Sequence, residues 1–311
     1  MSETWSTDRM PDQSGRVAVV TGANSGLGLI TGRELARRGA HVIMGCRSCA
    51  KGERAAEQIR AAAPGAALEV RELDLSSQES VRAFAEQVAA EHPKLDLLVN
   101  NGGIMAPPRT TTSEGWELQL ATNHLGHFAL TGLLLDALRA GDRTRVVTVS
   151  SLEHRPGEMK WDDLQREHGY NARAAYQQSK LANALFGLEL NRRLRAAGES
   201  VVSVLAHPGW TETNLQTTGP RGLRQWLYVA GNKVLAQGVE QGALPQLYAA
   251  TMPDVQGGEF IGPDGFHELR GNPTRTKPSR NARSEDDARR LWEVSEELTG
   301  VRYAFAAPAP A

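Results

Sequence analysis

A tyrosine and a lysine four residues apart form the first candidate for chemistry in this sequence. Tyr176 opens the stretch YQQSK, which ends at Lys180. A free phenol has a pKa near about 10, so at neutral pH it is a poor proton donor or acceptor. On a helix, residues i and i+4 share a face, and a nearby ammonium favours phenolate and lowers the tyrosine pKa. The pair could be a general acid–base, but the same spacing also fits a surface pair on a helix.

A glycine-rich turn near the N-terminus indicates a second kind of chemistry. The apolar stretch RVAVVT (16–21) runs into TGANSGLG (21–28), and a helical pattern follows. Such a turn lets backbone approach a diphosphate, and a helix N-terminus supplies free N–H groups. The spacing is G-x-x-x-G-x-G, and a turn that only packs helix on strand is the alternative. Its place after the first strand favours dinucleotide binding. The contacts are expected from Gly22, Asn24, Ser25, Gly26, Leu27 and Gly28.

The end of the second apolar stretch bears on which dinucleotide would bind. An NAD site has a carboxylate there, which holds the ribose 2′-hydroxyl. This chain instead reads HVIMGCR, from His41 to Arg47. An arginine fork matches a 2′-phosphate, and Lys51 could add charge nearby. A solvated charge at a helix start is the alternative, but a cation gains nothing at a helix N-terminus. The sequence therefore predicts NADP(H) as the cofactor.

Alternating apolar and helical stretches predict the scaffold for these residues. Further strands are expected at 41–45, 68–73, 95–100, 145–150 and 201–206, with a weaker seventh at 259–262. Helices are expected at 27–38, 50–62, 77–91, 114–139, 174–196 and 284–298. This order is typical of an α/β fold, a doubly wound Rossmann-type parallel sheet of about seven strands with helices on both faces. A single domain is expected over 15–302, with flexible ends at 1–14 and 303–311.

Composition argues against several other classes of protein. The 311 residues carry a formal net charge of −1, so neither nucleic acid nor an anionic membrane is an expected partner. The sequence lacks both an apolar run near the ~18 residues of a membrane span and a signal-peptide core. Cys46 and Cys49 form a C-x-x-C without a second ligand pair. A cytoplasmic, reduced protein without a metal is therefore expected.

Taken in order, the motifs resemble those of a classical short-chain dehydrogenase/reductase over nearly the whole chain. They are TGANSGLG (21–28), DL (74–75), NNGG (100–103), NHLG (123–126), SS (150–151), YQQSK (176–180) and the Pro208-Gly209 pair. Several are also similar to the branch of retinol dehydrogenases and protochlorophyllide reductases. The chain departs from the family in having NNGG where NNAG is usual. Tyr176 also lies 25 residues after Ser151, farther than in minimal members.

The resemblance implies roles for individual residues. Tyr176 would be the catalytic acid/base, and Ser151 would hydrogen-bond the substrate oxygen, with Ser150 as the fallback. Asn123 would position a water that leads to Lys180. The implied cofactor contacts, besides the glycine turn and Arg47, are Asp74, Leu75, Asn100, Gly102, Tyr176, Lys180, Pro208, Gly209 and Thr213.

The implied activity is an NADP(H)-dependent interconversion of a hydrophobic alcohol and its ketone or aldehyde. A non-catalytic NADP(H)-binding sensor and, less favoured, a nucleotide-sugar epimerase or dehydratase are the alternatives. An amphipathic stretch at 221–235, inside an expected substrate lid at about 210–240, could instead be a subunit or membrane-surface contact. His124 and His127 are interpreted as packing residues rather than metal ligands. Whether the chain forms a homo-oligomer is left open.

Overall fold

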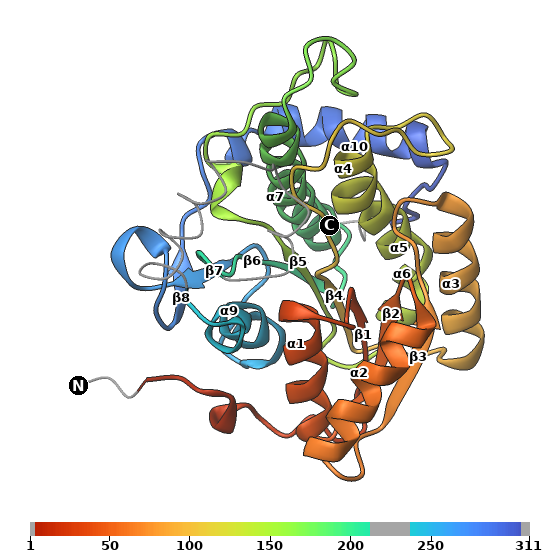
Figure 1. Cartoon of the computed structure of the whole chain (residues 1–311), viewed down its shortest axis with the longest axis vertical. Coiled ribbons are helices and arrows are strands. Elements are labelled where there is room, and N and C mark those ends of the chain that lie inside the picture. Colours follow the sequence, from red (N-terminus) through yellow and green to blue (C-terminus); the bar gives the residue numbers. More distant parts are fainter. Residues whose placement is uncertain (1–3, 212–236, 306–311) are drawn as a thin grey trace.

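A twisted sheet with helices on both faces forms the centre of the molecule (Figure 1). The computed structural model describes residues 4–211 and 237–305. Within them the sheet has eight strands in the order β3-β2-β1-β4-β5-β6-β7-β8. Neighbouring strands are parallel except β8, which runs antiparallel to β7. This confirms the predicted single-domain Rossmann-type fold, with one strand more than expected.

The strands follow the predicted apolar stretches closely. They are β1 (Val17–Thr21), β2 (His41–Cys46), β3 (Leu68–Glu72), β4 (Leu97–Asn100), β5 (Arg145–Val149), β6 (Val202–Ala206), β7 (Phe260–Pro263) and β8 (Pro273–Thr276). The central strands β4 and β5 are buried throughout, as a parallel sheet covered on both faces requires. The sequence did not predict β8, because its PTRT sequence is polar and opens with proline, which only an edge strand tolerates.

Helices cover the sheet in two layers. They are α1 (Gly26–Arg37), α2 (Cys49–Ala62), α3 (Gln78–Glu91), α4 (Leu118–Leu120), α5 (Gly126–Leu133), α6 (Leu135–Arg139), α7 (Ala172–Ala196), α9 (Val239–Thr251) and α10 (Glu285–Thr299). One core cluster joins the sheet to α1, α2 and α9, and another joins its opposite face to α3, α5 and α7. The expected helix at 114–139 is divided by a π-helical turn, η2 (Ala121–Leu125). α9 was missed because Pro245, inside it, normally interrupts a helix.

The expectation of flexible ends is corrected in part. Trp5 and Met10 are buried, and the Trp5 indole N–H donates to Met252 Sδ at 3.1 Å. At the other end Tyr303 is buried, and its hydroxyl donates to the carbonyl of Phe128 at 2.6 Å. Aromatic side chains bury large areas, which outweighs the loss of chain entropy at a terminus. The packed part of the chain therefore extends beyond 15–302 on both sides.

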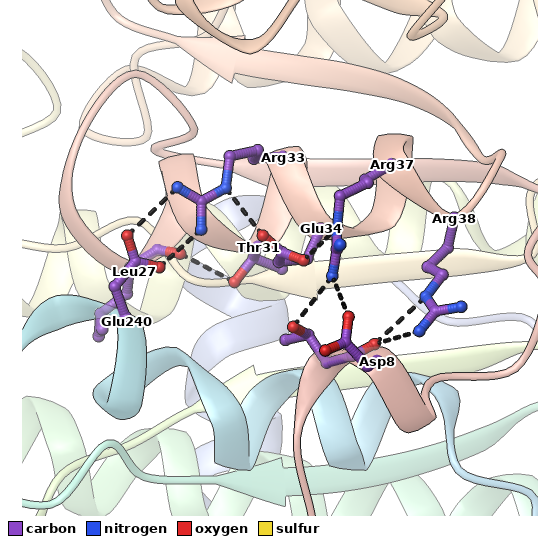
Figure 2. A network of polar contacts seen from close by, with 9 residues as sticks. Asp8, Leu27, Thr31, Arg33, Glu34, Arg37, Arg38 and Glu240 are labelled. Atoms are coloured by element: carbon purple, nitrogen blue, oxygen red, sulfur yellow. Dashed lines mark hydrogen bonds and ion pairs between the residues drawn. The ribbon is translucent and has the colours of Figure 1, made fainter. Parts of the chain in front are cut away.

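Polar contacts join α1 to the start of α9 and to the N-terminal segment (Figure 2). Arg33 forms a bidentate ion pair with Glu240 at the start of α9, and Arg37 forms an ion pair with Asp8 near the N-terminus. Both arginines also pair with Glu34, whose side chain is only 6% exposed. The pairs with Glu240 and Asp8, whose side chains are 61% and 79% exposed, contribute at most about 1 kcal/mol each.

Candidate active site

A cavity of about 500 Å³ lies at the carboxyl ends of the parallel strands. The strand order reverses between β2 and β4, on either side of β1, and ligands of doubly wound sheets bind outside such a switch point. Most of the predicted site residues line this cavity. They are Gly22, Asn24, Ser25, Gly26, Leu27, Arg47, Asp74, Leu75, Gly102, Ser151, Tyr176, Lys180, Pro208 and Gly209.

The glycines of the first turn have two different roles. Gly22 and Gly26 have positive φ angles of 66° and 55°, which side chains other than glycine rarely adopt. Gly28 does not line the cavity, and a Cβ there would lie 2.4 Å from the carbonyl oxygen of Gly22. Gly22 and Gly26 therefore shape the turn, whereas Gly28 lets α1 pack against it. The arrangement leaves the first N–H groups of α1 facing a space that a diphosphate could occupy.

The end of β2 supplies positive charge to the same cavity. Arg47 is exposed and follows Cys46, the last residue of the strand, and Lys51 lies in the first turn of α2. Both line the cavity. Asp74, after β3, accepts hydrogen bonds from the amide and the hydroxyl of Ser76. Its carboxylate is thus held by its own turn, at 2.9 Å and 2.6 Å from these donors.

The C-x-x-C pair does not form a disulfide. Cys46 is buried and Cys49 is exposed, and both are free thiols. Burial raises the pKa of the Cys46 thiol to about 12, so the thiolate needed for redox or metal chemistry is disfavoured at neutral pH.

Tyr176 and Lys180 share one face of α7, as the spacing predicted. Tyr176 is 6% exposed and Lys180 is 5% exposed. The ammonium of Lys180 lies 5.8 Å from the centre of the Tyr176 ring and donates to the carbonyl of Val149 at 3.2 Å. Burial lowers the pKa of Lys180 to about 8, so the side chain is still mostly charged at pH 7.

The two neighbouring serines differ in how they are bound. The Ser150 hydroxyl is buried and donates to the carbonyl of Lys180 at 2.8 Å, which fixes the end of β5 to α7. Ser151 is half-buried, and its hydroxyl oxygen accepts from the amide of Glu153 at 3.2 Å. The Ser151 hydroxyl proton is not used in that contact. Ser151 is therefore the better placed of the two to donate toward the cavity.

Asn123 lies beneath the cavity wall rather than in it. It is fully buried in η2, where its Oδ1 accepts from the amide of Ile104 at 2.9 Å and its Nδ2 donates to Ser179 at 2.9 Å. Gly103 lies between Asn123 and the cavity, because a Cβ on Gly103 would lie 3.0 Å from Asn123 Oδ1 and 3.6 Å from Lys180 Nζ. π-helical turns are common at functional sites, and this one brings Asn123 close to Lys180.

The predicted cofactor contact Asn100 is not brought to the cavity. Its side chain is buried and donates to Thr131 at 2.9 Å, whereas the neighbouring Asn101 lines the cavity. Asn101 holds the glycine turn by donating to the carbonyl of Thr21 at 2.9 Å. At Gly102, where the family usually has alanine, a Cβ would lie 2.7 Å from a methyl carbon of Leu75. The predicted contact Thr213 and the stretch 221–235 lie outside the described residues.

Sequence reasoning also missed an apolar part of the cavity wall. It consists of Leu73, Ile104, Met105, Leu152, Trp210 and Leu269. Leu269 follows a short 3₁₀-helix (Phe266–Glu268) after β7, and the amide of Trp210 donates to its carbonyl at 2.7 Å. No motif marks these residues, because their proximity depends on how distant loops meet.

The histidines near the site are buried and neutral. Burial lowers the pKa of His124 to about 3, of His127 to about 4 and of His154 to about 4. His124 packs against Phe128 and lies 2.8 Å from the Ser295 hydroxyl, which agrees with the packing interpretation.

A Rossmann-type sheet with a nucleotide-sized cavity and these motifs defines a class, the nicotinamide-dependent oxidoreductases. The family model of the short chain dehydrogenases matches residues 16–222. The chain is 41% identical over 300 residues to retinol dehydrogenase 14 of Mus musculus, covering 92% of this chain and 86% of that protein. It is 41% identical over 289 residues to retinol dehydrogenase 12 of Homo sapiens, covering 93% and 88%.

A solved structure agrees with these relatives. The crystal structure of an uncharacterized protein from Mycobacterium paratuberculosis has a TM-score of 0.81 to this chain at 43% sequence identity, covering 97% of this chain and 100% of that one. The chain belongs to the short-chain dehydrogenase family, in its retinol-dehydrogenase-like branch. It is thus an oxidoreductase that acts on CH–OH and C=O groups with a nicotinamide dinucleotide. Within residues 4–211 and 237–305, no helix is long and apolar enough to cross a membrane.

Proposed function

We propose that this chain is an NADP(H)-dependent enzyme that interconverts an apolar alcohol and its aldehyde or ketone, with Tyr176 as the acid/base. One observation carries the proposal. Tyr176, Lys180 and Ser151 line the same cavity as the glycine turn and Arg47. The side chains suited to proton transfer and those suited to binding a nucleotide therefore lie in one cavity.

The preference for NADP(H) rests on charge at the far end of the cavity. β2 ends at Cys46 and Arg47 follows it, where an NAD site would have a carboxylate for the ribose hydroxyls. The guanidinium of Arg47 could bind a 2′-phosphate, with the ammonium of Lys51 nearby. The turn from Gly22 to Gly26 and the N-terminus of α1 would hold the diphosphate.

The proton chemistry rests on α7. A nicotinamide dinucleotide, held by the glycine turn and Arg47, would supply or accept the hydride at the substrate carbon. Tyr176 donates its proton to the developing alkoxide, and Ser151 donates a second hydrogen bond to the same oxygen. The charged Lys180 stabilises the phenolate that remains. Asn123 positions a water that leads to Lys180 and so to solvent.

The substrate is proposed to be apolar because of the wall formed by Ile104, Met105, Leu152, Trp210 and Leu269. The relatives named retinol dehydrogenases make retinoid-like alcohols and aldehydes the first compounds to test. Thr211 and Gln237 pair at either end of the stretch 212–236, and Thr211 lines the cavity. A cytoplasmic location remains a prediction from the sequence.

The test is NADPH and NADH oxidation with a panel of apolar aldehydes and ketones, including retinal. We expect turnover with NADPH that falls about 10²–10⁴-fold in Tyr176→Phe. Binding of NADPH, measured by fluorescence titration, should be retained in the variant. Undiminished turnover in Tyr176→Phe would rule out the acid/base role. Tight NADPH binding by the natural sequence with no turnover of any carbonyl would instead favour the non-catalytic sensor.

A further inference from the structure

Two histidines and a glutamate meet near the amino ends of β2 and β3, whereas the cavity lies at the carboxyl ends of the strands. His41 is the first residue of β2, Glu69 is the second residue of β3, and His92 caps the C-terminus of α3. β3 is the edge strand of the sheet, and α3 lies beside it (Figure 1). The sequence did not suggest a metal site here, because the three residues do not form a local metal-binding motif.

Both imidazoles face the same carboxylate oxygen. Oε2 of Glu69 lies 2.9 Å from His92 Nε2 and 3.3 Å from His41 Nε2. Two ligands at about 2.0–2.1 Å from a tetrahedral zinc ion are themselves about 3.3 Å apart. All three ligand atoms lie within 4.8 Å of one another. Small side-chain rotations would therefore place them around one ion, with the fourth position left for water.

A hydrogen bond explains His92 but not His41. Nε2 of His41 is buried, and no hydrogen-bond partner for it occurs in the described part of the chain. Its contact with Glu69 has the distance of an ion pair without the geometry of a hydrogen bond. A buried nitrogen without a partner is unfavourable, and a metal ion would satisfy its lone pair.

An arginine next to the cluster holds the carboxylate of Glu69 in place. Arg71 pairs with the other oxygen of Glu69 and also with Glu91, so its positive charge is shared between two carboxylates. Arg71 is outside the proposed ligand set, and it orients the carboxylate of Glu69 as residues that hydrogen-bond the ligands do in known metal sites.

We propose that His41, Glu69 and His92 bind a divalent transition-metal ion, with Zn²⁺ as the natural candidate. Two imidazoles and one carboxylate suit zinc, which has no strong geometric preference of its own. The ion would link β2, the edge strand β3 and the end of α3. Because these residues lie at the opposite edge from Tyr176 and Lys180, its effect would be on stability rather than on turnover.

The experiment uses the untagged, metal-free full chain in equilibrium dialysis with micromolar Zn²⁺, followed by elemental analysis and thermal melting. We expect one Zn²⁺ per chain and a rise in Tm of a few degrees. Glu69→Gln, His92→Gln and His41→Gln should each weaken binding by at least about tenfold and abolish the rise. His41→Gln is the most conservative for folding, since Nε2 of His41 has no hydrogen-bond partner within the described residues.

Two control variants separate this site from unspecific binding. His168, whose side chain is 86% exposed beside Asp163, and the exposed thiol of Cys49 are the alternative ligands. His168→Gln and Cys49→Ser should keep the bound ion and the rise in Tm. Loss of the ion in either control, or the same Zn²⁺ content in the three cluster variants as in the natural sequence, would overturn the proposal.

Discussion

At the carboxyl edge of the sheet, Lys180 is buried and forms no ion pair with any described residue, and its ammonium donates only to the carbonyl of Val149. At the amino edge, Asp96 is buried too, but both of its oxygens accept backbone N–H groups. Val17 donates to one at 2.8 Å and Asp142 to the other at 2.9 Å. One edge leaves a charge poorly compensated, and the other uses a charge to complete the backbone hydrogen bonds.

The difference indicates that the carboxyl ends of the strands serve the chemistry and the amino ends serve stability. Uncompensated buried charge costs folding free energy and tends to be found where a perturbed pKa is needed for chemistry. Compensated buried charge completes hydrogen bonds that would otherwise be lost. The carboxyl edge should therefore show large effects of mutation on turnover, and the amino edge large effects on stability.

The largest effect is expected at Lys180. Lys180→Met should lower turnover by about 10²–10⁴-fold, because the proposed acid/base loses its neighbouring charge. The same variant should raise the free energy of unfolding at pH 7. The pKa falls from 10.5 to about 8, and about 1.36 kcal/mol per unit corresponds to a gain of up to roughly 3 kcal/mol.

The pH dependence of this gain in unfolding free energy tests the account of Lys180. The folded pKa is lowered, so the unfolded chain binds the proton more tightly and the penalty is complete below pH 8. As pH rises from 8 toward 10.5 the penalty disappears, and the advantage of Lys180→Met should shrink with it. Urea unfolding of the natural sequence and of Lys180→Met, at pH 7 and near pH 10.5, would measure this difference in stability. The exposed Lys94→Met is the control. An unchanged difference between the two pH values would contradict the account of Lys180.

The next effect is expected at the amino edge. Asp96→Ala leaves the amides of Val17 and Asp142 without their partners, which should lower the free energy of unfolding by about 2–4 kcal/mol. Turnover per folded molecule should be unchanged. Asp136→Ala is the matched control, because the carboxylate of Asp136 is 95% exposed, and it should change stability by less than about 0.5 kcal/mol. A fall in turnover without a loss of stability would contradict the division between the edges.

The smallest of the three effects concerns the cofactor. Arg47→Ala removes the guanidinium proposed to bind the 2′-phosphate, so the KM for NADPH should rise about 10–100-fold. The KM for NADH and the stability should hardly change, since Arg47 is exposed. Steady-state kinetics with both cofactors would measure this, with the exposed Arg54→Ala on α2 as control. Equal losses for NADPH and NADH would argue against the proposed preference for NADP(H).

Patterns within short segments were sufficient to predict most of the scaffold. The buried strand VAVVT and the glycine turn after it lie where expected, because apolar runs and glycine positions reflect local backbone requirements. The shared face of Tyr176 and Lys180 follows from helical spacing alone. The family and the class of reaction could be predicted for the same reason, since each motif is a few residues long.

Tertiary structure decided what depends on contacts between distant segments. Both Ser150 and Ser151 line the cavity, but the Ser150 hydroxyl donates to the carbonyl of Lys180, a contact between distant segments. α9 forms despite Pro245 because it packs against α1 and the sheet. His41, Glu69 and His92 become neighbours only when β2, β3 and α3 assemble. Such partners depend on how the whole chain packs, and no local pattern in the sequence carries that information.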